Sequence, residues 1–517
     1  MSGARPAYRV NRHLSHDIFR YLPALAIPIA LGTLSTIVFA RIAAPADLGR
    51  FLLVIALSTS ISSPCAQWVQ QAVLRFYPVY ALNGEAQAYV RCAALLGLAS
   101  GVVASLVTIV ALWIGFGDTT TAAPDLLAAA ALTFFTVAGA GRASVLQATF
   151  ALTRYSLLNS LTAVLKFALP LVLLRALPPF EALLFGTAIA AFVSWAALMA
   201  QRPAAAAQTG KPWGLARILR AGRESASFGL PLSVSEVGVQ VLQFSDRYAI
   251  GALLGPAAVG LYGTNYSIAE KLVILVQAPL IYAAHSPIVA AWERGDRREV
   301  ASLIRTAMRW LMLFGAPLVA FSVVRGELVS SLLLGEQYAQ GHVVIPIAAA
   351  SILVYAASQY GHKTFELGKQ TWVITSALLT AAVTNLVGVV VLITAIGYLG
   401  GALGTAVGYG VYALLVFALS RRHSSAFAWD IPWRTLVVSC AGAALASIAW
   451  AVLVPERVQS LLDFVWVAVC GLLGLTIYVA VLLLTRELPI SQRFGRSVGL
   501  RLRSAWNRKY GEPSRTG

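Results

Sequence analysis

Long apolar stretches alternate with short polar segments along almost the whole chain. Apolar runs of about 18 residues or more recur, and a run of that length predicts a transmembrane helix, since about 20 helical residues cross the hydrocarbon core of a bilayer. The sequence therefore predicts an all-α, polytopic membrane protein with about fourteen transmembrane helices. These lie near residues 20–40, 51–72, 91–115, 124–145, 156–177, 180–200, 226–253, 258–284, 305–324, 341–360, 372–396, 399–420, 432–454 and 462–485.

Composition and charge support this fold class. The chain is 58% hydrophobic and 12% charged, whereas a soluble protein carries about 25% charged residues. With a cytoplasmic N-terminus and fourteen helices, 31 of the 39 lysines and arginines fall in cytoplasmic segments. This asymmetry predicts cytoplasmic N- and C-termini. The basic charge also suits anionic lipid headgroups, and no polar segment is large enough to hold a nucleic-acid-binding module.

The two halves of the chain resemble each other. The segment APADLGRF (residues 44–51) matches GPAAVGLY (residues 255–262), which aligns Pro45 with Pro256 and Gly49 with Gly260. LFGTA (184–188) and ALGTA (402–406) match at nearly the same offset, near the ends of the two halves. The repeat predicts two six-helix bundles in the same orientation, an arrangement found in transporters whose substrate path lies between the halves.

The expected organisation has five parts. A six-helix N-terminal lobe (1–200) is followed by a basic cytoplasmic linker (201–225), a six-helix C-terminal lobe (226–420), two additional transmembrane helices (421–485) and a basic cytoplasmic tail (486–517). The polar segments are too short for a soluble catalytic domain, and the sequence has no G-x-x-x-x-G-K-[ST] phosphate-binding loop. We therefore expect a transporter that is not an enzyme and needs no cofactor. The four cysteines lack metal-ligand spacing, so no metal site is expected either.

Polar side chains form a stripe on the seventh expected helix. Ser233, Glu236, Gln240, Gln243 and Arg247 follow a spacing close to the helical period, so they share one face. Such a face is expected to lie against protein or water, because placing charge in lipid costs several kcal/mol.

Shorter stripes occur on other helices, and the charges among them predict a central site. Asp246 lies beside the stripe on the seventh helix, and Glu270 and Lys271 lie on the antiparallel eighth helix. These charges are expected to meet Arg247 near the middle of the membrane, in a wet cavity between the halves. The other stripe residues are Thr264 and Ser267 on the eighth helix, Asn159, Thr162 and Lys166 on the fifth, and Gln67 and Gln71 on the second.

The residue types suggest roles. The cations Arg247, Lys271 and Lys166 predict an anionic substrate, since arginine grips phosphate with paired hydrogen bonds and lysine acts as a point charge. Asp246, Glu270 and Glu236 are candidates for ion coupling, although Asp246 with Lys271, or Arg247 with Glu270, could instead form ion pairs that only fix packing. Glu236 could likewise be satisfied by Gln240. The expected polar lining consists of Gln240, Gln243, Asn159, Gln67, Gln71 and Thr264.

Three segments resemble the polysaccharide transporter family. DRYAIGALLGPAAVGLY (246–262) is similar to the central motif of the O-antigen and exopolysaccharide flippases (Wzx type). PALAIPIALGTLSTIVFARIAAPADLGRF (23–51) looks like the first helix of that family with its following loop. LGKQTWVITSALLTAAVTNLVGVVVLITAIGYLGGALGTAVGY (367–409) looks like the eleventh and twelfth helices. The likeness extends over about residues 15 to 420 and places the chain in the multidrug/oligosaccharidyl-lipid/polysaccharide exporter superfamily.

This resemblance implies a mechanism and a cargo. It implies two six-helix bundles that alternate between inward-open and outward-open states and move an undecaprenyl-pyrophosphate-linked oligosaccharide from the cytoplasmic to the periplasmic leaflet. A proton or sodium gradient would drive the cycle, and a glycan polymerase and a chain-length regulator would be partners. The last two helices would form a groove for the lipid tail, as in the related lipid II flippases.

The same residues and loops also bear on three other possible functions. A multidrug antiporter of the sister family would favour an acidic, aromatic-lined cavity for cationic drugs, whereas the cations within these helices favour an anion. A membrane glycan polymerase or ligase is disfavoured by the short external loops and the internal repeat. A scaffold role for the basic tail is compatible with transport.

Overall fold

The computed structural model describes residues 14–116, 123–149, 151–201, 213–423, 429–458 and 460–488. These residues form helices joined by short connections, without any strand among them, so the predicted all-α class is confirmed. The helices are α1 (Leu14–Ile42), α2 (Pro45–Leu82), α3 (Ala86–Phe116), α4 (Ala123–Ala148), α5 (Leu152–Leu173), α6 (Pro179–Ala200), α7 (Leu215–Leu254), α8 (Pro256–Glu293), α9 (Arg297–Leu334), the 3-10 helix η2 (Glu336–Gly341), α10 (Val344–Leu367), α11 (Thr371–Ile396), α12 (Leu399–His423), α13 (Trp433–Leu453) and α14 (Leu461–Leu484).

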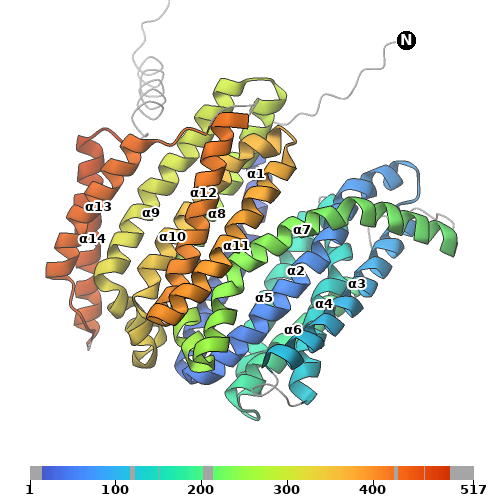
Figure 1. Cartoon of the computed structure of the whole chain (residues 1–517), viewed down its shortest axis with the longest axis horizontal. Helices are drawn as coiled ribbons and strands as arrows, with labels where there is room; N and C mark the ends of the chain where they lie inside the picture. The colour runs from blue at the N-terminus through green and yellow to red at the C-terminus, as the bar shows by residue number, and fades with distance from the viewer. Residues whose placement is uncertain are drawn as a thin grey trace, which may run out of the picture.

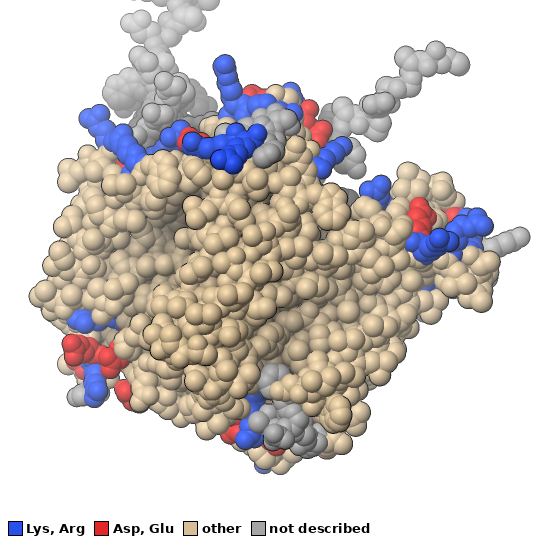
Figure 2. Space-filling model, viewed as in Figure 1, with Lys and Arg blue, Asp and Glu red and all other residues tan. Residues whose placement is uncertain are grey.

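The helices have the length and composition of membrane spans. Twelve of the described helices are long and apolar enough to cross a bilayer, and α1 adds a shorter apolar stretch, Ile27–Ile42. Figure 2 shows charged side chains gathered at the two ends of the molecule, with a broad uncharged belt between them. Lysine and arginine dominate at one end, which we call the basic end; we call the other the opposite end. The chain is a multi-pass membrane protein.

Two bundles of helices lie side by side. In Figure 1, α2–α6 form the group on the right and α8–α12 the group on the left. α1 packs mainly on α5 and also contacts α8 and α9. α7 links the two bundles, because it packs along α2 and also along α11. It begins at Leu215, so its first turns occupy part of the segment expected as a linker (201–225).

The two repeated segments pack directly against each other at the opposite end. Pro45 opens α2 and Pro256 opens α8, a position where the missing N–H of proline is not needed. A Cβ on Gly49 would overlap the carbonyl oxygen of Pro256, and one on Gly260 would overlap that of Pro45. Each half therefore presents the same Pro-x-x-x-Gly surface to the other, and glycine is required because the two backbones touch.

Hydrogen bonds also join the bundles at the opposite end. Arg41, which ends α1, donates from Nε to the carbonyl oxygen of Leu333 at 3.2 Å. The buried Tyr338 of η2 donates from its hydroxyl to the carbonyl oxygen of Ala43 at 3.0 Å. The turn between α1 and α2 is thus held by α9 and η2, and the bundles are closed against each other at this end.

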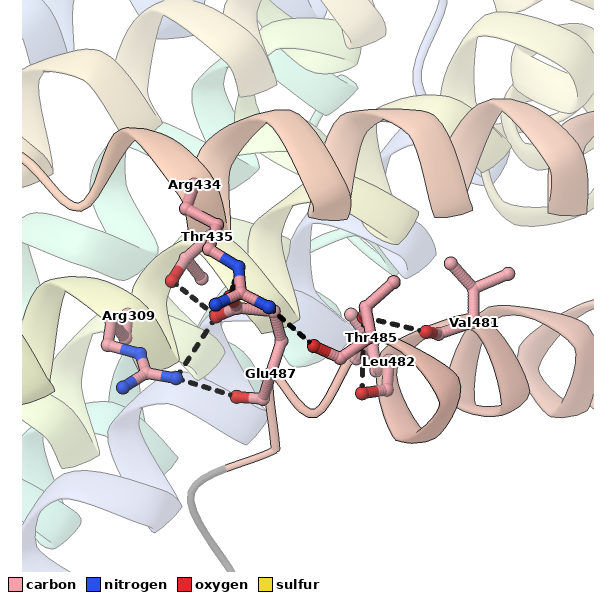
Figure 3. A network of polar contacts seen from close by, with 7 residues as sticks. All are labelled: Arg309, Arg434, Thr435, Val481, Leu482, Thr485 and Glu487. Atoms are coloured by element: carbon pink, nitrogen blue, oxygen red, sulfur yellow. Dashed lines mark hydrogen bonds and ion pairs between the residues drawn. The ribbon is translucent and has the colours of Figure 1, made fainter.

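The pair α13 and α14 is attached to α9. Figure 3 shows the carboxylate of Glu487, just beyond α14, between Arg309 of α9 and Arg434 and Thr435 of α13. It accepts from Arg309 Nη2 and Arg434 Nε at 3.0 Å each and from Thr435 Oγ1 at 2.7 Å. Glu487 is 3% exposed, so its carboxylate is buried, whereas the Arg434 side chain that pairs with it is largely exposed. The cluster connects α9 and α13 to the end of α14.

A second attachment lies further along α9. Arg325, at a kink in that helix, donates from Nη2 to the carbonyl oxygens of Ala451 and Val454 at 2.6 Å each. Buried apolar residues, Trp450 among them, fill the space between the two attachments. The last two helices are therefore fixed to the C-terminal bundle at two separate places along α9.

Candidate functional site

A cavity of about 390 Å³ lies within the N-terminal bundle. Four helices, α2, α4, α5 and α6, form its wall. The described lining carries six hydroxyls, one amide and one amine. It consists of Ile55, Ser58, Thr59, Ser62, Ser63, Ala66, Gln70, Leu132, Thr136, Lys166 and Thr187. Cavities of about 300–1,000 Å³ are the usual size of small-molecule sites.

The hydroxyl groups come mostly from one segment of α2, STSISS (residues 58–63). These residues are not among the predicted site residues, although six consecutive positions with five hydroxyls are unusual inside an apolar helix. Ser58 Oγ is buried and has no hydrogen-bond partner among the described residues, so it can form a hydrogen bond with a ligand in the cavity. Thr187 comes from the repeated LFGTA segment of α6 and faces the same cavity.

Lys166 is the predicted cation that the structure places in this cavity. It lies on α5, its side chain is accessible, and no carboxylate of the described residues lies within ion-pair distance. Its stripe partner Thr162 instead donates to Ser194 Oγ at 2.9 Å and to its own helix. Asn159 is half-buried and does not line the cavity.

The glutamines predicted on α2 lie beside the cavity lining. Gln67 and Gln71 are half-buried, whereas Gln70 contributes to the wall. One residue along a helix corresponds to about 100° of rotation, so Gln71, the position after Gln70, points away from the wall to which Gln70 contributes.

Asp246 occupies the centre of the C-terminal bundle and is fully buried. Its carboxylate accepts from Tyr262 OH at 2.5 Å, from the backbone N–H of Arg247 at 2.7 Å and from Thr405 Oγ1 at 3.4 Å. These bonds join α7, α8 and α12. In this arrangement the carboxylate fixes helix packing and has no exposed surface.

Arg247 is also buried, with 5% of its surface exposed. Its guanidinium carbon lies 4.9 Å from the ring centre of Phe244 and 5.1 Å from that of Tyr266. Nη1 donates to the carbonyl oxygen of Gln243 at 3.1 Å, while Gln243 itself is half-buried. Among the described residues no carboxylate pairs with this charge within 4.0 Å, so the expected meeting with Glu270 as an ion pair is not formed here.

The remaining residues of the α7 stripe face the N-terminal bundle. Ser233 Oγ donates to the carbonyl oxygen of Pro64 at 2.9 Å. Glu236 accepts from Ser63 Oγ at 2.5 Å and from Gln240 Nε2 at 2.7 Å. Glu236 therefore bonds a residue that lines the cavity, on the seam between α2 and α7, but is not itself part of the described lining.

The predicted site residues of α8 differ in burial and in the groups they contact. Thr264 is fully buried and its hydroxyl donates to the carbonyl oxygen of Gly260 in its own helix, so it does not line a cavity. Glu270 and Lys271 are half-buried. Lys271 lies against α1, since a Cβ on Gly32 would be 3.8 Å from its Cε. It therefore faces the other bundle, outside the described cavity lining.

The cavity has the chemistry of a site for a polar anion. A lysine supplies the positive charge, and hydroxyls and an amide supply donors and acceptors of the kind that sugars and phosphate oxygens require. The described lining holds no carboxylate. No group of three histidine, cysteine or acidic side chains gathers within the described part of the chain, so no metal ligand set is present there.

Comparison with known proteins shows which family the chain belongs to and which solved structures share its fold. A sequence profile described as polysaccharide biosynthesis protein matches residues 38–342. A probable low-salt glycan biosynthesis flippase, Agl15 of Haloferax volcanii, is 22% identical over 212 residues, which cover 39% of this chain. The match spans 44% of the length of that relative.

Solved structures have the same fold. The lipid II flippase MurJ in an inward closed conformation superposes with a TM-score of 0.72 at 12% identity and covers 91% of this chain and 99% of its own. A multidrug resistance MATE family transporter in an inward-facing conformation gives a TM-score of 0.60 at 16% identity, over 78% of this chain and 99% of its own. At these identities the likeness establishes the arrangement of helices.

Proposed function

Since the chain belongs to the family of polysaccharide biosynthesis proteins, we propose that it is a flippase for a lipid-linked oligosaccharide. The cargo is an undecaprenyl-pyrophosphate-linked repeat unit of a lipopolysaccharide O-antigen or an exopolysaccharide. It moves from the cytoplasmic to the periplasmic leaflet of the bacterial inner membrane by alternating access. The flippase relative and the flippase of similar fold support this class of activity.

The observation that carries the proposal is the cavity around Lys166. A lipid-linked oligosaccharide has an anionic pyrophosphate and a polyhydroxyl sugar, whereas its lipid tail stays in the bilayer. The amine of Lys166 matches the pyrophosphate. The side chains that match the sugar are Ser58, Thr59, Ser62, Ser63, Gln70 and Thr187. An apolar cargo would leave these groups without partners, which costs about 1–3 kcal/mol for each buried group.

The distribution of charge supports the orientation. The basic end would be cytoplasmic, because lysine and arginine stay on that side of bacterial membranes. The opposite end, where Gly49 and Gly260 cross, would then be periplasmic and closed in this conformation. Release of cargo to the periplasm would require this crossing to separate.

Other predicted residues have supporting roles in the proposal. Lys271 faces α1 and would contact the headgroup from the second bundle. Arg247 carries a buried charge that forms no ion pair within 4.0 Å with a described carboxylate, and such a residue in a membrane span favours a functional role. Glu236, Asp246 and Glu270 stay candidates for coupling to a proton or sodium gradient. Membrane lipids, a glycan polymerase and a chain-length regulator stay the proposed partners.

A multidrug antiporter is the alternative, since a transporter of that kind shares the fold. A cationic drug would need a carboxylate or an aromatic surface in its site, and the described cavity lining has neither.

The test is the sidedness of lipid-linked oligosaccharide in membrane vesicles from cells that lack this protein. We expect cargo to accumulate on the cytoplasmic leaflet and the wild-type chain to relieve this accumulation. Lys166→Met should slow translocation about tenfold, which corresponds to about 1.4 kcal/mol of lost headgroup binding. The matched control is Lys369→Met, which removes an exposed lysine outside the cavity and should behave as wild type.

Two outcomes would contradict the proposal. Normal sidedness in cells without this protein or another flippase would exclude the activity itself. Equal rates for Lys166→Met and wild type would exclude the cavity as the headgroup site.

A further inference from the structure

The helix α7 is longer than a single membrane crossing requires. Its 40 residues extend over about 60 Å, whereas the hydrocarbon core of a bilayer is about 30 Å thick. In Figure 1 the first turns of α7 reach beyond the rest of the N-terminal bundle, and Figure 2 shows basic side chains gathered at that corner of the basic end. We call residues 215–225 the α7 arm. The arm lies where a membrane protein meets lipid headgroups.

One face of the α7 arm is attached to the N-terminal bundle. Arg217 pairs with Glu85, the residue before α3, at 2.5 Å, and its guanidinium carbon lies 5.1 Å from the ring centre of Trp213. The hydroxyls of Tyr89 on α3 and Ser225 share a hydrogen bond of 3.3 Å. These contacts fix the rotation of the arm about its axis, so the side chains of its other faces point in defined directions.

A second face of the arm carries exposed leucines. Leu215 is 72% exposed and Leu219 is 63% exposed, and a spacing of four residues places them on one side of the helix. At about 100° per residue, Leu230, Val234 and Val237 fall on the same side, and they are also exposed. These three lie where α7 packs between α2 and α11, which are both apolar enough to span the membrane. The apolar row therefore runs from the arm into the part of α7 that lies in the bilayer.

Arginines lie next to this apolar row. Arg220 and Arg223 are exposed, and neither forms an ion pair with a carboxylate of the described residues. Around the helix axis they lie about 40–100° from Leu219, on the side of the leucines that faces away from the bundle. The arm therefore presents an apolar row beside a basic row, which is the pattern of a helix that lies in the membrane–water interface.

We propose that the α7 arm docks on anionic lipid headgroups at the basic end of the molecule. The two leucines of the arm reach the outer part of the acyl chains, and Arg220 and Arg223 bind lipid phosphates, since guanidinium groups pair with phosphate through two N–H donors. Each arginine near an anionic surface raises the affinity about fivefold. This surface is independent of the proposed function, because its partner is the lipid around the protein and not the cargo.

The continuity of the apolar row favours lipid over a protein partner. A protein that docks from the aqueous side would cover Leu215 and Leu219, but it could not reach the continuation of the row within the bilayer. Lipid covers both parts of the row. Because α7 packs along both bundles, docking of the arm also sets the depth in the membrane of the helix that joins them.

The experiment measures which lipids touch the arm in the full-length protein. A bimane fluorophore is attached to Leu219→Cys after the four native cysteines are replaced by alanine, and the protein is placed in nanodiscs of phosphatidylcholine and phosphatidylglycerol. One of the two lipids carries a nitroxide near its headgroup, which quenches the fluorophore on contact. We expect strong quenching at Leu219→Cys and weak quenching at Glu224→Cys, which lies on another exposed side of the arm. Labelled phosphatidylglycerol should quench a few-fold more strongly than the same amount of labelled phosphatidylcholine.

Substitutions separate the basic row from the overall charge of the protein. Arg220→Gln combined with Arg223→Gln should bring the quenching ratio of the two lipids close to one, whereas Arg220→Lys with Arg223→Lys should keep most of it. Arg217 stays unchanged, so the arm remains attached to the bundle. The matched control combines Arg298→Gln with Arg422→Gln, which removes two exposed arginines of the other bundle and should leave the ratio as in the wild type.

Three results would overturn the docking surface. Equally weak quenching at Leu219→Cys and Glu224→Cys would mean that the arm lies in water, as a site for a soluble protein requires. Equal quenching by the two lipids with both arginines intact would exclude recognition of anionic headgroups. A ratio that the control pair lowers as much as the arm pair would assign the effect to overall charge.

Salt replaces the glutamine pair if that variant does not fold. Charges are screened beyond about 3 Å at about 1 M salt, so a lipid ratio that survives this concentration also overturns the proposal. The quenching result does not require cargo, so a failure of the flippase proposal leaves it readable.

Discussion

The two bundles differ in whether the polar side chains at their centres line a cavity or are fully buried. In the N-terminal bundle, Thr187 faces a cavity together with Lys166. In the C-terminal bundle, Thr405, which the repeat aligns with Thr187, donates to the buried carboxylate of Asp246. The helix pairs beneath them are alike, because Gly186 packs on Pro170 of α5 and Gly404 on Val389 of α11.

This difference separates two roles that charge can have in a membrane protein. A carboxylate with three hydrogen-bond donors and no exposed surface stabilises the contact of three helices. An accessible lysine without a carboxylate partner among the described residues can meet an anion that enters from outside. The same backbone arrangement therefore supports a closed core in one half and a polar cavity in the other, and the side chains decide which.

The largest expected effects are at the glycine crossing, where the two bundles should behave alike. Gly49→Ala and Gly260→Ala should each lower the thermal unfolding midpoint in detergent, to a similar extent, because either Cβ overlaps a backbone oxygen of the other bundle. Gly115→Ala near the end of α3 is the control, because no described atom outside its own turn lies within 4 Å of the added Cβ, and it should leave the midpoint near that of wild type. Unequal midpoints for the two variants would mean that the halves differ here as they do at their centres.

The next effect tests the closed core. Asp246→Ala should destabilise the protein by about 2–4 kcal/mol, because the donors on Tyr262, Thr405 and the backbone of Arg247 lose their acceptor. Lys166→Met should leave the unfolding midpoint near that of wild type, since its amine makes no ion pair with a described residue.

The opposite result for these two variants would mean that the polar groups of the two bundles do not have different roles. If Asp246→Ala keeps its unfolding midpoint and loses only transport, then the C-terminal centre is also a functional site. Thermal unfolding and vesicle sidedness, measured on the same preparations, separate the two cases.

Much of the fold could be predicted from the sequence because lipid imposes a simple rule on composition. Long apolar runs identified the helices, and the family resemblance is confirmed by the profile match over residues 38–342. The start of α7 at Leu215 was missed because Arg217, Arg220 and Arg223 interrupt the apolar pattern. That part of the helix is polar and exposed, so hydrophobicity could not reveal it.

The site was harder to predict, because helix rotation decides which polar residue lines a cavity. Lys166, which lines the cavity, could be singled out from the sequence because a lysine in a membrane span is rare. The hydroxyls of residues 58–63 were missed, and Thr264 was expected in the lining although it bonds its own helix. Serine and threonine can satisfy themselves on a carbonyl one turn earlier, so their presence in a span does not show which way they face.

The smallest and sharpest test exchanges the two aligned threonines for valine. Thr405→Val should lower stability by about 0.5–1 kcal/mol and leave transport unchanged, because it removes one long hydrogen bond to Asp246. Thr187→Val should leave stability nearly unchanged and reduce transport a few-fold, because it removes one hydroxyl from the cavity wall. Each variant has the other as its control, since both delete the same atom from aligned helix positions. If both change transport and neither changes stability, the C-terminal bundle opens its centre to cargo during the cycle, and the contrast between the bundles belongs to this conformation alone.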